Sequence, residues 1–380
     1  MRRLYPAVPP LLAAALLTVS IPVSFASVVP LAQVMEKEME AKTEKIVLPR
    51  TRPLPPAPVP VADGNAPEKK ALPETDAGET AALPSSPPGA RIALGKPQTY
   101  SVGEEDTLLD VARHFRLGFV EIRAANPKVD PWTPVPGEQI VIPSFRLLPR
   151  ARQEGIVVNL AQMRLYYFEG PEKDPVTFPI GIGREGLQTP TGETTVIRKT
   201  ADPVWRPTER MLEEKPWLPA AVPAGPSNPL GTHALYLGWP TFLIHGSNKP
   251  WAIGRRVSSG CMRMYPEDII ELFNKVPVGT KVTVVDQPIL VGRVGDDVYL
   301  EANPSRSQSG EIEIGGSHAL EGMSGTLKKA IIAAAGIPEG RIDWDIVEKA
   351  VEERLGYPVI IDRKPEPEKK KPEPGGFNYN

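Results

Sequence analysis

Proline is distributed very unevenly along this chain of 380 residues, and that distribution limits which parts can fold. Twelve of the 46 prolines lie between Pro49 and Pro97, and the run from Lys364 to Pro374 mixes Pro, Glu and Lys. Such segments bury too little apolar surface to offset the loss of chain entropy, and proline favours extended, solvated backbone. We therefore expect a semi-rigid linker over residues 27–96, a disordered tail over 363–380 and folded domains between them.

The first residues have the pattern of a secretory signal peptide. Arg2 and Arg3 supply a positive start, and an apolar stretch with small residues at its end runs from Leu11 to Phe25. We expect residues 1–26 to be removed on export from the cytoplasm. Retention of the stretch as a membrane anchor is the less favoured alternative, because Pro22 interrupts it and it is short for a membrane span.

Charge and cysteine content exclude several classes of protein. The formal net charge is −2, with 44 basic and 46 acidic residues, so no bulk attraction to nucleic acid is expected. The chain has one cysteine, Cys261, which therefore cannot form an internal disulfide and is a poor basis for a metal cage. An unpaired thiol in an oxidising compartment is a liability unless it has a chemical role.

The surroundings of Cys261 favour a nucleophile. It follows Ser258-Ser259-Gly260 and precedes Met262-Arg263, and the dipeptide His245-Gly246 begins sixteen positions upstream. An exposed backbone, a nearby imidazole and a positive charge are what an activated thiol requires. The alternative is a small buried apolar residue, as free cysteines often are. The polar residues before the thiol and the arginine after it argue against that alternative.

Residues 97–144 have the pattern of a small module. Thr99 to Val102 is a predicted strand, and Asp106 is placed to cap a helix whose apolar positions recur at helical spacing. Phe119 to Ala125 indicates a second helix, and Gln139 to Pro143 a second strand after the Pro136-Gly137 turn. A β-α-α-β unit of this size has too small a core for an enzyme.

This module resembles the LysM family in Tyr100-x-Val102, Asp106-Thr107-Leu108, Ala125-Asn126-Pro127 and Pro136-Gly137. The resemblance implies binding to the N-acetylglucosamine-containing glycan strands of peptidoglycan, in a groove between two loops. The implied glycan-binding residues are Gly103, Asp106, Thr107, Asn126 and Pro127. The alternative is a structural spacer of the same fold without affinity for glycan.

From Gly155 onward the sequence is typical of strands. Predicted strands cover Gly155–Asn159, Met163–Phe168, Val176–Ile180, Glu193–Ile197, Ala234–Leu237, Phe242–His245 and Lys281–Val285. One helix is clear, with Pro266 in its first turn and an apolar face of Ile269, Ile270, Leu272 and Phe273. We expect residues 154–286 to form a mostly β sandwich or open barrel that carries the cysteine at a strand edge.

This region resembles the YkuD-like catalytic domain of L,D-transpeptidases. The matching motifs occur in family order: Asn159-Leu160, Arg164-Leu165-Tyr166, Thr189-Pro190-Thr191-Gly192, Asn228-Pro229-Leu230-Gly231, Ala234-Leu235-Tyr236, Ile244-His245-Gly246 and Ser258-x-Gly260-Cys261-x-Arg263. One departure is Ser259, because the family often has a histidine directly before the Gly-Cys pair. His245 is then the one base candidate near the thiol within these motifs.

Roles for the catalytic residues follow from their chemistry. Cys261 is the expected nucleophile and His245 the base that accepts its proton, while Gly260 allows close backbone approach, so that its amide and that of Cys261 can face an oxyanion. Either Ser247 or a backbone carbonyl can orient the imidazole. The candidate substrate-binding residues are Arg263, Ser258, Ser259, Gly246, Tyr236 and Trp251.

Four of these assignments have structural alternatives. Arg263 can bind a substrate carboxylate or neutralise Glu267 or Asp268 on the next helix. Ser258 can instead support its own loop, and Tyr236, like Trp251, can belong to the core.

The resemblance implies acyl transfer on peptidoglycan stem peptides, without metal or other cofactor. A thioester acyl-enzyme would form with release of D-alanine, and an amine of a second stem or of an envelope protein would accept the acyl group, giving 3-3 crosslinks or wall–protein linkages. The expected location is the periplasm or cell wall, after transport across the inner membrane, with no stable membrane span and no nucleic-acid partner. The alternatives are an L,D-carboxypeptidase that uses water and a catalytically weak or inert wall-binding protein.

Residues 287–362 carry weaker patterns. Val294–Leu300 and Val359–Ile361 are predicted strands, and Thr326–Ala335 and Asp343–Leu355 are predicted helices that end at glycines. We expect a small α/β appendage, and its position after the cysteine motif raises the hypothesis of a lid over the cleft.

Overall fold

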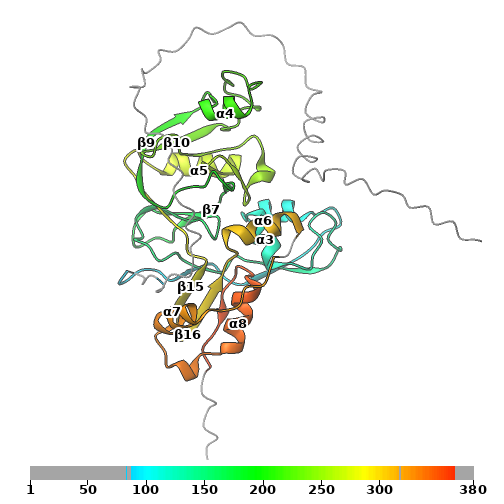
Figure 1. The fold of residues 1–380 in the computed structure, drawn as a ribbon, viewed down its shortest axis with the longest axis vertical. Coiled ribbons are helices and arrows are strands. Elements are labelled where there is room, and N and C mark those ends of the chain that lie inside the picture. Colours follow the sequence, from blue (N-terminus) through cyan, green and yellow to red (C-terminus); the bar gives the residue numbers. More distant parts are fainter. Residues whose placement is uncertain (1–82, 84–86, 316–317, 364–380) are drawn as a thin grey trace, which may run out of the picture. The chain divides into compact units, whose positions relative to one another are not determined.

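The computed structural model describes residue 83 and residues 87–315 and 318–363 (Figure 1). The predicted signal peptide and nearly all of the predicted linker and tail lie outside the described residues. In the described part of the chain, none of the helices has the length and apolar character needed to cross a membrane.

The small module has the predicted order of elements. Its strands and helices are β2 (Gln98–Ser101), α2 (Leu108–His114), α3 (Phe119–Ala125) and β3 (Gln139–Ile142). The two strands pair antiparallel, and Leu108, Leu117 and Ile122 are fully buried beneath them. A further strand, β1 (Ala93–Leu94), pairs with β4 (Arg146–Leu147), so the last residues of the segment that we expected to be a linker take part in a sheet.

The cap of α2 is Thr107, and the prediction of Asp106 in this position was wrong. The Thr107 hydroxyl accepts a hydrogen bond from the Asp110 amide at 3.2 Å, and the Asp110 carboxylate accepts one from the Thr107 amide at 3.3 Å. This reciprocal pair is a capping box. The Asp106 carboxylate instead accepts from the Gly103 amide at 2.7 Å and from the Tyr100 hydroxyl at 2.8 Å, and so it shapes the loop before the helix.

The central domain is mostly β, with an eight-stranded mixed sheet that curls into a half barrel. The strand order is β13 (Met262–Arg263), β11 (Leu243–His245), β10 (His233–Leu237), β9 (Gly192–Ala201), β14 (Lys281–Val285), β5 (Gly155–Asn159), β6 (Arg164–Phe168) and β7 (Val176–Pro179). Smaller elements are β8 (Ile182–Gly183), which pairs parallel with β12 (Arg256–Ser258), the helices α4 (Glu209–Glu214) and α5 (Pro266–Lys275), and the 3₁₀ turn η1 (Pro250–Ala252).

Backbone pairing joins the two ends of this sheet. Gly181, two residues beyond β7, forms a bridge with Arg263 of the opposite edge strand, β13. The Gly181 amide donates to the Arg263 carbonyl and the Arg263 amide donates to the Gly181 carbonyl, each at 2.9 Å. Because β13 also pairs parallel with β11, the residue before it, Cys261, is held at the seam of the sheet.

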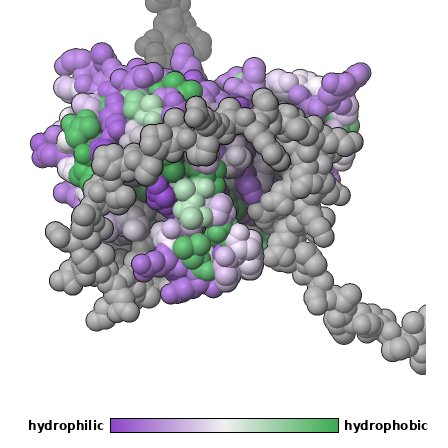
Figure 2. All heavy atoms as spheres, turned by 90° about the horizontal axis from the view of Figure 1, so that it is seen from above, coloured by the Kyte–Doolittle hydropathy of each residue, from purple (hydrophilic) through white to green (hydrophobic). Residues whose placement is uncertain are grey.

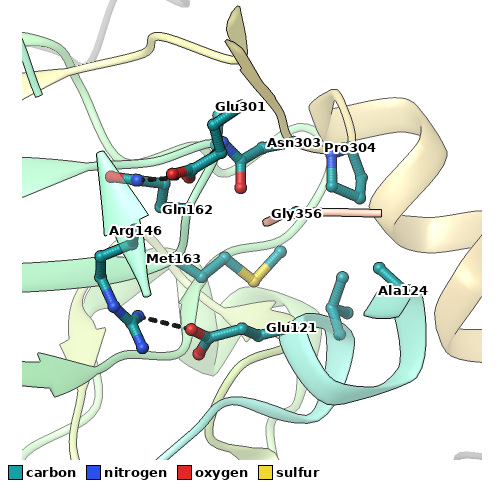
Figure 3. A pocket seen from close by; sticks show the side chains of 11 residues that line it. Glu121, Ala124, Arg146, Gln162, Met163, Glu301, Asn303, Pro304 and Gly356 are labelled. Carbon is teal, nitrogen blue, oxygen red and sulfur yellow. Dashed lines mark hydrogen bonds and ion pairs between the residues drawn. The ribbon is translucent and has the colours of Figure 1, made fainter. Parts of the chain in front are cut away.

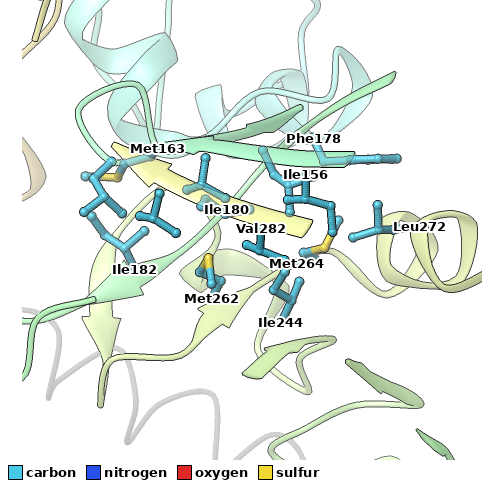
Figure 4. Close-up of a cluster of buried hydrophobic side chains, with 14 of the residues drawn as sticks. Ile156, Met163, Phe178, Ile180, Ile182, Ile244, Met262, Met264, Leu272 and Val282 are labelled. Atoms are coloured by element: carbon cyan, nitrogen blue, oxygen red, sulfur yellow. The ribbon is translucent and has the colours of Figure 1, made fainter. Parts of the chain in front are cut away.

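The main core lies between this sheet and α5. Alternate residues of the strands face inward, so Leu235, Ile244 and Met262 are fully buried and contact the same cluster as Ile269 and Leu272 of α5. Figure 4 shows the inward side chains of several strands gathered with α5 at one side. Pro266 occupies the first helical turn of α5, as the sequence predicted.

The C-terminal segment has its own sheet and core. Its elements are β15 (Ile289–Val294), β16 (Asp297–Ala302), α6 (Arg306–Gly315), α7 (Gly325–Ala335), η2 (Glu339–Arg341), α8 (Trp344–Glu353) and β17 (Val359–Ile360). β16 lies between β15 and β17 in an antiparallel sheet, against which α7 and α8 pack. Gly336, with φ of +61°, ends α7 in the left-handed conformation that glycine adopts readily.

The small module and the central domain meet through backbone contacts. The first amides of α3, Phe119 and Val120, donate to the carbonyls of Ile253 at 3.2 Å and Gly254 at 3.0 Å. These amides lack partners within their own helix, so the central domain satisfies them. A Cβ on Gly254 would lie 2.2 Å from the Cα of Gly118, so neither position tolerates a side chain.

A buried group of charges joins the module, the central domain and the C-terminal segment. Glu121 of α3 pairs with Arg146 at 2.6 Å and with Arg164 of β6 at 3.0 Å. Glu301 of β16 accepts from Gln162 at 2.7 Å (Figure 3). Glu121, Arg146, Gln162 and Glu301 line one cavity at the junction of the three segments. Burial raises the pKa of Glu301, while its hydrogen bonds from the neighbouring amides act in the opposite direction.

Loss of the Glu121 carboxylate should destabilise the protein, because it leaves two buried guanidinium groups without their common partner. We expect Glu121→Ala to lower the free energy of unfolding by about 3–5 kcal/mol. Chemical denaturation measures this change. Glu104→Ala, at an exposed site in the same module, is the matched control and should change stability by less than about 0.5 kcal/mol. Equal effects of the two substitutions would contradict the proposed importance of the buried pair.

Candidate active site

Strand register places the candidate catalytic residues on one face of the sheet. Ile244 and Met262 are register partners that face the core, whereas their neighbours His245 and Arg263 are partners on the opposite face. Residues two apart on an extended strand share a face, so Cys261, which directly precedes β13, lies on the same side as Arg263. By this register, Cys261 and His245 lie on the face of the sheet opposite to that of Ile244 and Met262.

The cysteine is accessible and sits in a tightly constrained loop. Cys261 is partly exposed, and its thiol donates to the carbonyl oxygen of Thr241 at 3.5 Å. Gly260 has φ of +103°, and a Cβ there would lie 2.7 Å from the ring of Phe242. Glycine is therefore required at this position both by backbone conformation and by space.

Ser258 is part of the scaffold of this loop. Its side chain is 1% exposed, and its hydroxyl donates to the Cys261 carbonyl at 2.6 Å while it accepts from the Gly260 amide at 3.1 Å. This corrects the prediction of Ser258 as a substrate contact and supports the alternative of a loop support. It also corrects the prediction that the Gly260 amide faces an oxyanion, because that amide is bonded to Ser258.

His245 is held as a neutral imidazole. Its ring is buried, and its Nδ1 lies 2.6 Å from the carbonyl oxygen of Gly246. A carbonyl only accepts, so Nδ1 carries the proton and the neutral ring keeps its lone pair on Nε2. Burial and the charge of Arg263 lower the pKa of His245 to about 3, against the opposing effect of the Gly246 and Leu230 backbone.

The group that orients the imidazole is thus a backbone carbonyl. The other candidate, Ser247, uses its hydroxyl to accept from the Lys249 amide at 2.9 Å. Gly246 is buried and positions His245, and a Cβ there would lie 3.0 Å from Ile269, so its predicted role as a substrate contact was wrong.

The loop before β10 packs against Gly246 and Ser247, the two residues that follow His245. The buried Asn228 side chain donates to the carbonyls of Pro203, Val222 and Pro223 and accepts from the Leu230 amide. Gly231, with φ of +65°, passes so close to Ser247 that a Cβ would lie 2.7 Å from its amide nitrogen. The sequence showed the Asn-Pro-Leu-Gly motif but not this role, which depends on contacts between distant segments.

The remaining predicted substrate residues occupy different positions. Tyr236 is partly exposed on the same face as His245, and the guanidinium of Arg198 lies 3.4 Å above its ring. Ser259 is partly exposed beside the thiol. Trp251 lies in η1, with the Lys249 ammonium 5.6 Å from its ring centroid.

Glu267 and Asp268, which the sequence suggested as alternative partners of Arg263, form ion pairs with arginines of the small module. Glu267 contacts Arg113 at 2.9 Å, and the buried Asp268 lies 3.6 Å from Arg116. Burial raises the pKa of Asp268 to about 6.

The predicted glycan-binding residues mostly shape the module itself. Asn126 is buried, and its side chain bonds the backbone of Ile122 and Val141, so the prediction of a direct glycan contact was wrong. Asp106 and Thr107 hold the loop and the cap of α2, as described above. Pro127 is exposed and Gly103 partly exposed.

The surface above α4 carries exposed apolar side chains. Trp217 is 75% exposed and Val204 48% exposed in the segment between β9 and β10. Figure 2, which views the protein from above, shows hydrophobic areas separated by hydrophilic ones.

Over the described ranges, no group of three or more His, Cys, Asp or Glu is arranged to hold a metal ion.

A curled β sheet with a cysteine loop and a buried histidine at its seam defines the class, and comparison with known proteins assigns the family. The model of the L,D-transpeptidase catalytic domain, YkuD, matches residues 153–284. The chain is 39% identical to "Probable L,D-transpeptidase YbiS" of Escherichia coli K12, over 72% of this chain and 90% of the relative. The chain belongs to the L,D-transpeptidase family.

A second sequence relative agrees with this assignment, and a solved structure is similar to the catalytic region. "Probable L,D-transpeptidase YcfS" of Escherichia coli K12 is 37% identical, over 74% of this chain and 88% of the relative. The solved catalytic domain of an Enterococcus faecium L,D-transpeptidase is 25% identical, covering 36% of this chain and 98% of that chain, with a TM-score of 0.29. The family assignment depends on the sequence relatives.

The lowered pKa of His245 predicts a pH dependence of stability. The folded protein keeps this ring neutral down to about pH 3, whereas the ring takes up a proton below its usual pKa of 6.5 in the unfolded chain. The unfolded state binds more protons, so the free energy of unfolding decreases as the pH falls from about 7. His245→Gln removes this contribution. Between pH 7.5 and pH 4, wild type should lose about 3 kcal/mol more than the variant in chemical denaturation. Parallel curves would contradict the prediction.

Proposed function

We propose that this protein is a cysteine-dependent L,D-transpeptidase that acts on peptidoglycan stem peptides. The observation that carries the proposal is the register of β11 and β13, which sets a partly exposed Cys261 on the same face as His245. Family membership supports the reaction class.

In the proposed reaction, the Cys261 sulfur attacks the carbonyl between the L-centre of the diamino acid and the terminal D-alanine. Nε2 of His245 takes the thiol proton as the carbon–sulfur bond forms, and it returns that proton to the departing D-alanine amine. An amine then attacks the thioester and the carbon–sulfur bond breaks, which gives the crosslink or the linkage to an envelope protein. His245 takes the proton that the amine loses and returns it to the departing sulfur, which frees the thiol. In both steps, the protons move between the substrates, Cys261 and His245.

The low pKa of His245 bears on how the thiol is activated. At neutral pH the His245 ring is uncharged, so it can take the proton of the thiol when the reaction begins. Arg263 is a source of the charge that lowers this pKa. A substrate carboxylate bound to Arg263 would offset that charge and make the imidazole more basic when substrate is present.

We propose that the small module binds peptidoglycan glycan as a LysM module. The support is its β-α-α-β order and the two loops at 103–107 and 126–129, where the side chains of Asp106 and Asn126 bond to backbone atoms of the module. The exposed backbone of these loops, with Pro127, would contact the sugar. Export to the periplasm, with residues 27–96 as the linker, completes the proposal.

An inert wall-binding protein is the second candidate, because Ser259 stands where the family often has histidine. Acylation by a β-lactam separates the two. A solved relative, the Enterococcus faecium catalytic domain, is described as acylated by ertapenem. Intact mass measurement after incubation of this protein with ertapenem should show one adduct on Cys261, and a folded but unmodified protein would favour the inert candidate.

Cys261→Ala should abolish turnover of a disaccharide-tetrapeptide while leaving glycan binding intact. Mass spectrometry of the products is the measurement. A product with the mass of two donors minus D-alanine identifies crosslinking, and a donor that has lost D-alanine and gained water identifies a carboxypeptidase. Thr191→Val, at an exposed site of the same domain, is the control and should retain at least about half of the wild-type rate. Turnover by Cys261→Ala would place the chemistry elsewhere.

A further inference from the structure

Thr189 makes two buried hydrogen bonds that reach the cysteine loop. Its side chain is 3% exposed, and its hydroxyl donates to the carbonyl oxygen of Gly260 at 2.9 Å. The same hydroxyl accepts from the Gly183 amide at 3.1 Å. Gly183 lies in β8, which pairs with β12, so the contact joins a fixed part of the sheet to the loop.

The Gly260 carbonyl belongs to the peptide unit that also contains the Cys261 amide. The described backbone has no cis peptide bonds, and in a planar trans peptide the carbonyl and the N–H point in opposite directions. A hydrogen bond that fixes the Gly260 carbonyl therefore also fixes the direction of the Cys261 N–H. Rotation of this peptide would turn that N–H away from the position where charge develops during acyl transfer.

Ser258 holds the two neighbouring peptides of the same loop. Its hydroxyl accepts from the Gly260 amide of the Ser259–Gly260 peptide and donates to the Cys261 carbonyl of the Cys261–Met262 peptide. Gly260 has no side chain and a positive φ, so hydrogen bonds such as these and the one from Thr189 help to fix its backbone.

We propose that Thr189 is a positioning residue for the oxyanion site of the Cys261 reaction. It acts through the Gly260–Cys261 peptide and does not contact the substrate or the sulfur. The inference rests on the proposed acyl transfer and deepens it, because it assigns oxyanion stabilisation to the Cys261 amide rather than to the Gly260 amide.

Two reactions of the same thiol test this role. Acylation by ertapenem passes through a tetrahedral oxyanion, whereas alkylation by iodoacetamide is a direct displacement at carbon without one. Thr189→Val keeps the shape and removes the hydroxyl, Thr189→Ser keeps the hydroxyl, and Thr191→Val is the exposed control in the same motif. Both rates are measured by intact mass spectrometry, with thermal unfolding as the check on folding.

We expect Thr189→Val to slow acylation about 10- to 100-fold, somewhat less than loss of an oxyanion donor itself, and to leave alkylation within about twofold. Thr189→Ser should recover most of the acylation rate, and kcat with a tetrapeptide donor should fall more than KM rises. An equal loss in both reactions, or no loss in either, would overturn the positioning role. Absence of acylation in wild type would instead overturn the proposed function.

Discussion

The pairing of Gly181 with Arg263 is the constraint on which the catalytic region depends. These two backbone hydrogen bonds join the ends of an eight-stranded sheet, and they hold β13 between β11 and the segment after β7. A two-residue strand has little stability of its own, so β13 exists because both neighbours pair with it. The position of Cys261 relative to His245 follows from this closure rather than from any interaction local to the cysteine.

Polar groups are buried in two parts of the molecule, and their surroundings differ: one group is paired with opposite charges and the other is kept neutral. At the junction of the three segments, the Glu121 carboxylate lies between Arg146 and Arg164, and each partner offsets the cost of removing the others from water. At the active site, burial and the charge of Arg263 keep His245 uncharged. The first arrangement gives a fixed connection, and the second gives a group that can accept a proton.

The sequence predicted most strands and the α5 helix because their apolar residues repeat at the right period, and the resemblance of residues 154–286 to the L,D-transpeptidase catalytic domain was confirmed. It did not predict α6, whose residues Arg306 to Gly315 lack a strong helical pattern and are stabilised by packing against α3 and by the bond from Arg256 to Glu313. The errors at Asp106, Asn126 and Ser258 share one cause. Short polar side chains bond to nearby backbone as readily as to ligands, and only the folded geometry distinguishes the two uses.

The contact between Gly118 and Gly254 has a consequence for how this architecture can vary. Two glycines in backbone contact, with helix amides bonded to the loop at Ile253, require that both surfaces change together. The small module therefore cannot be replaced by a homologous module unless the contacting loop of the central domain changes as well. A transplanted homologue would need a glycine at the entry of its second helix, and the recipient would need a glycine turn like that at Gly254, seven residues before Cys261.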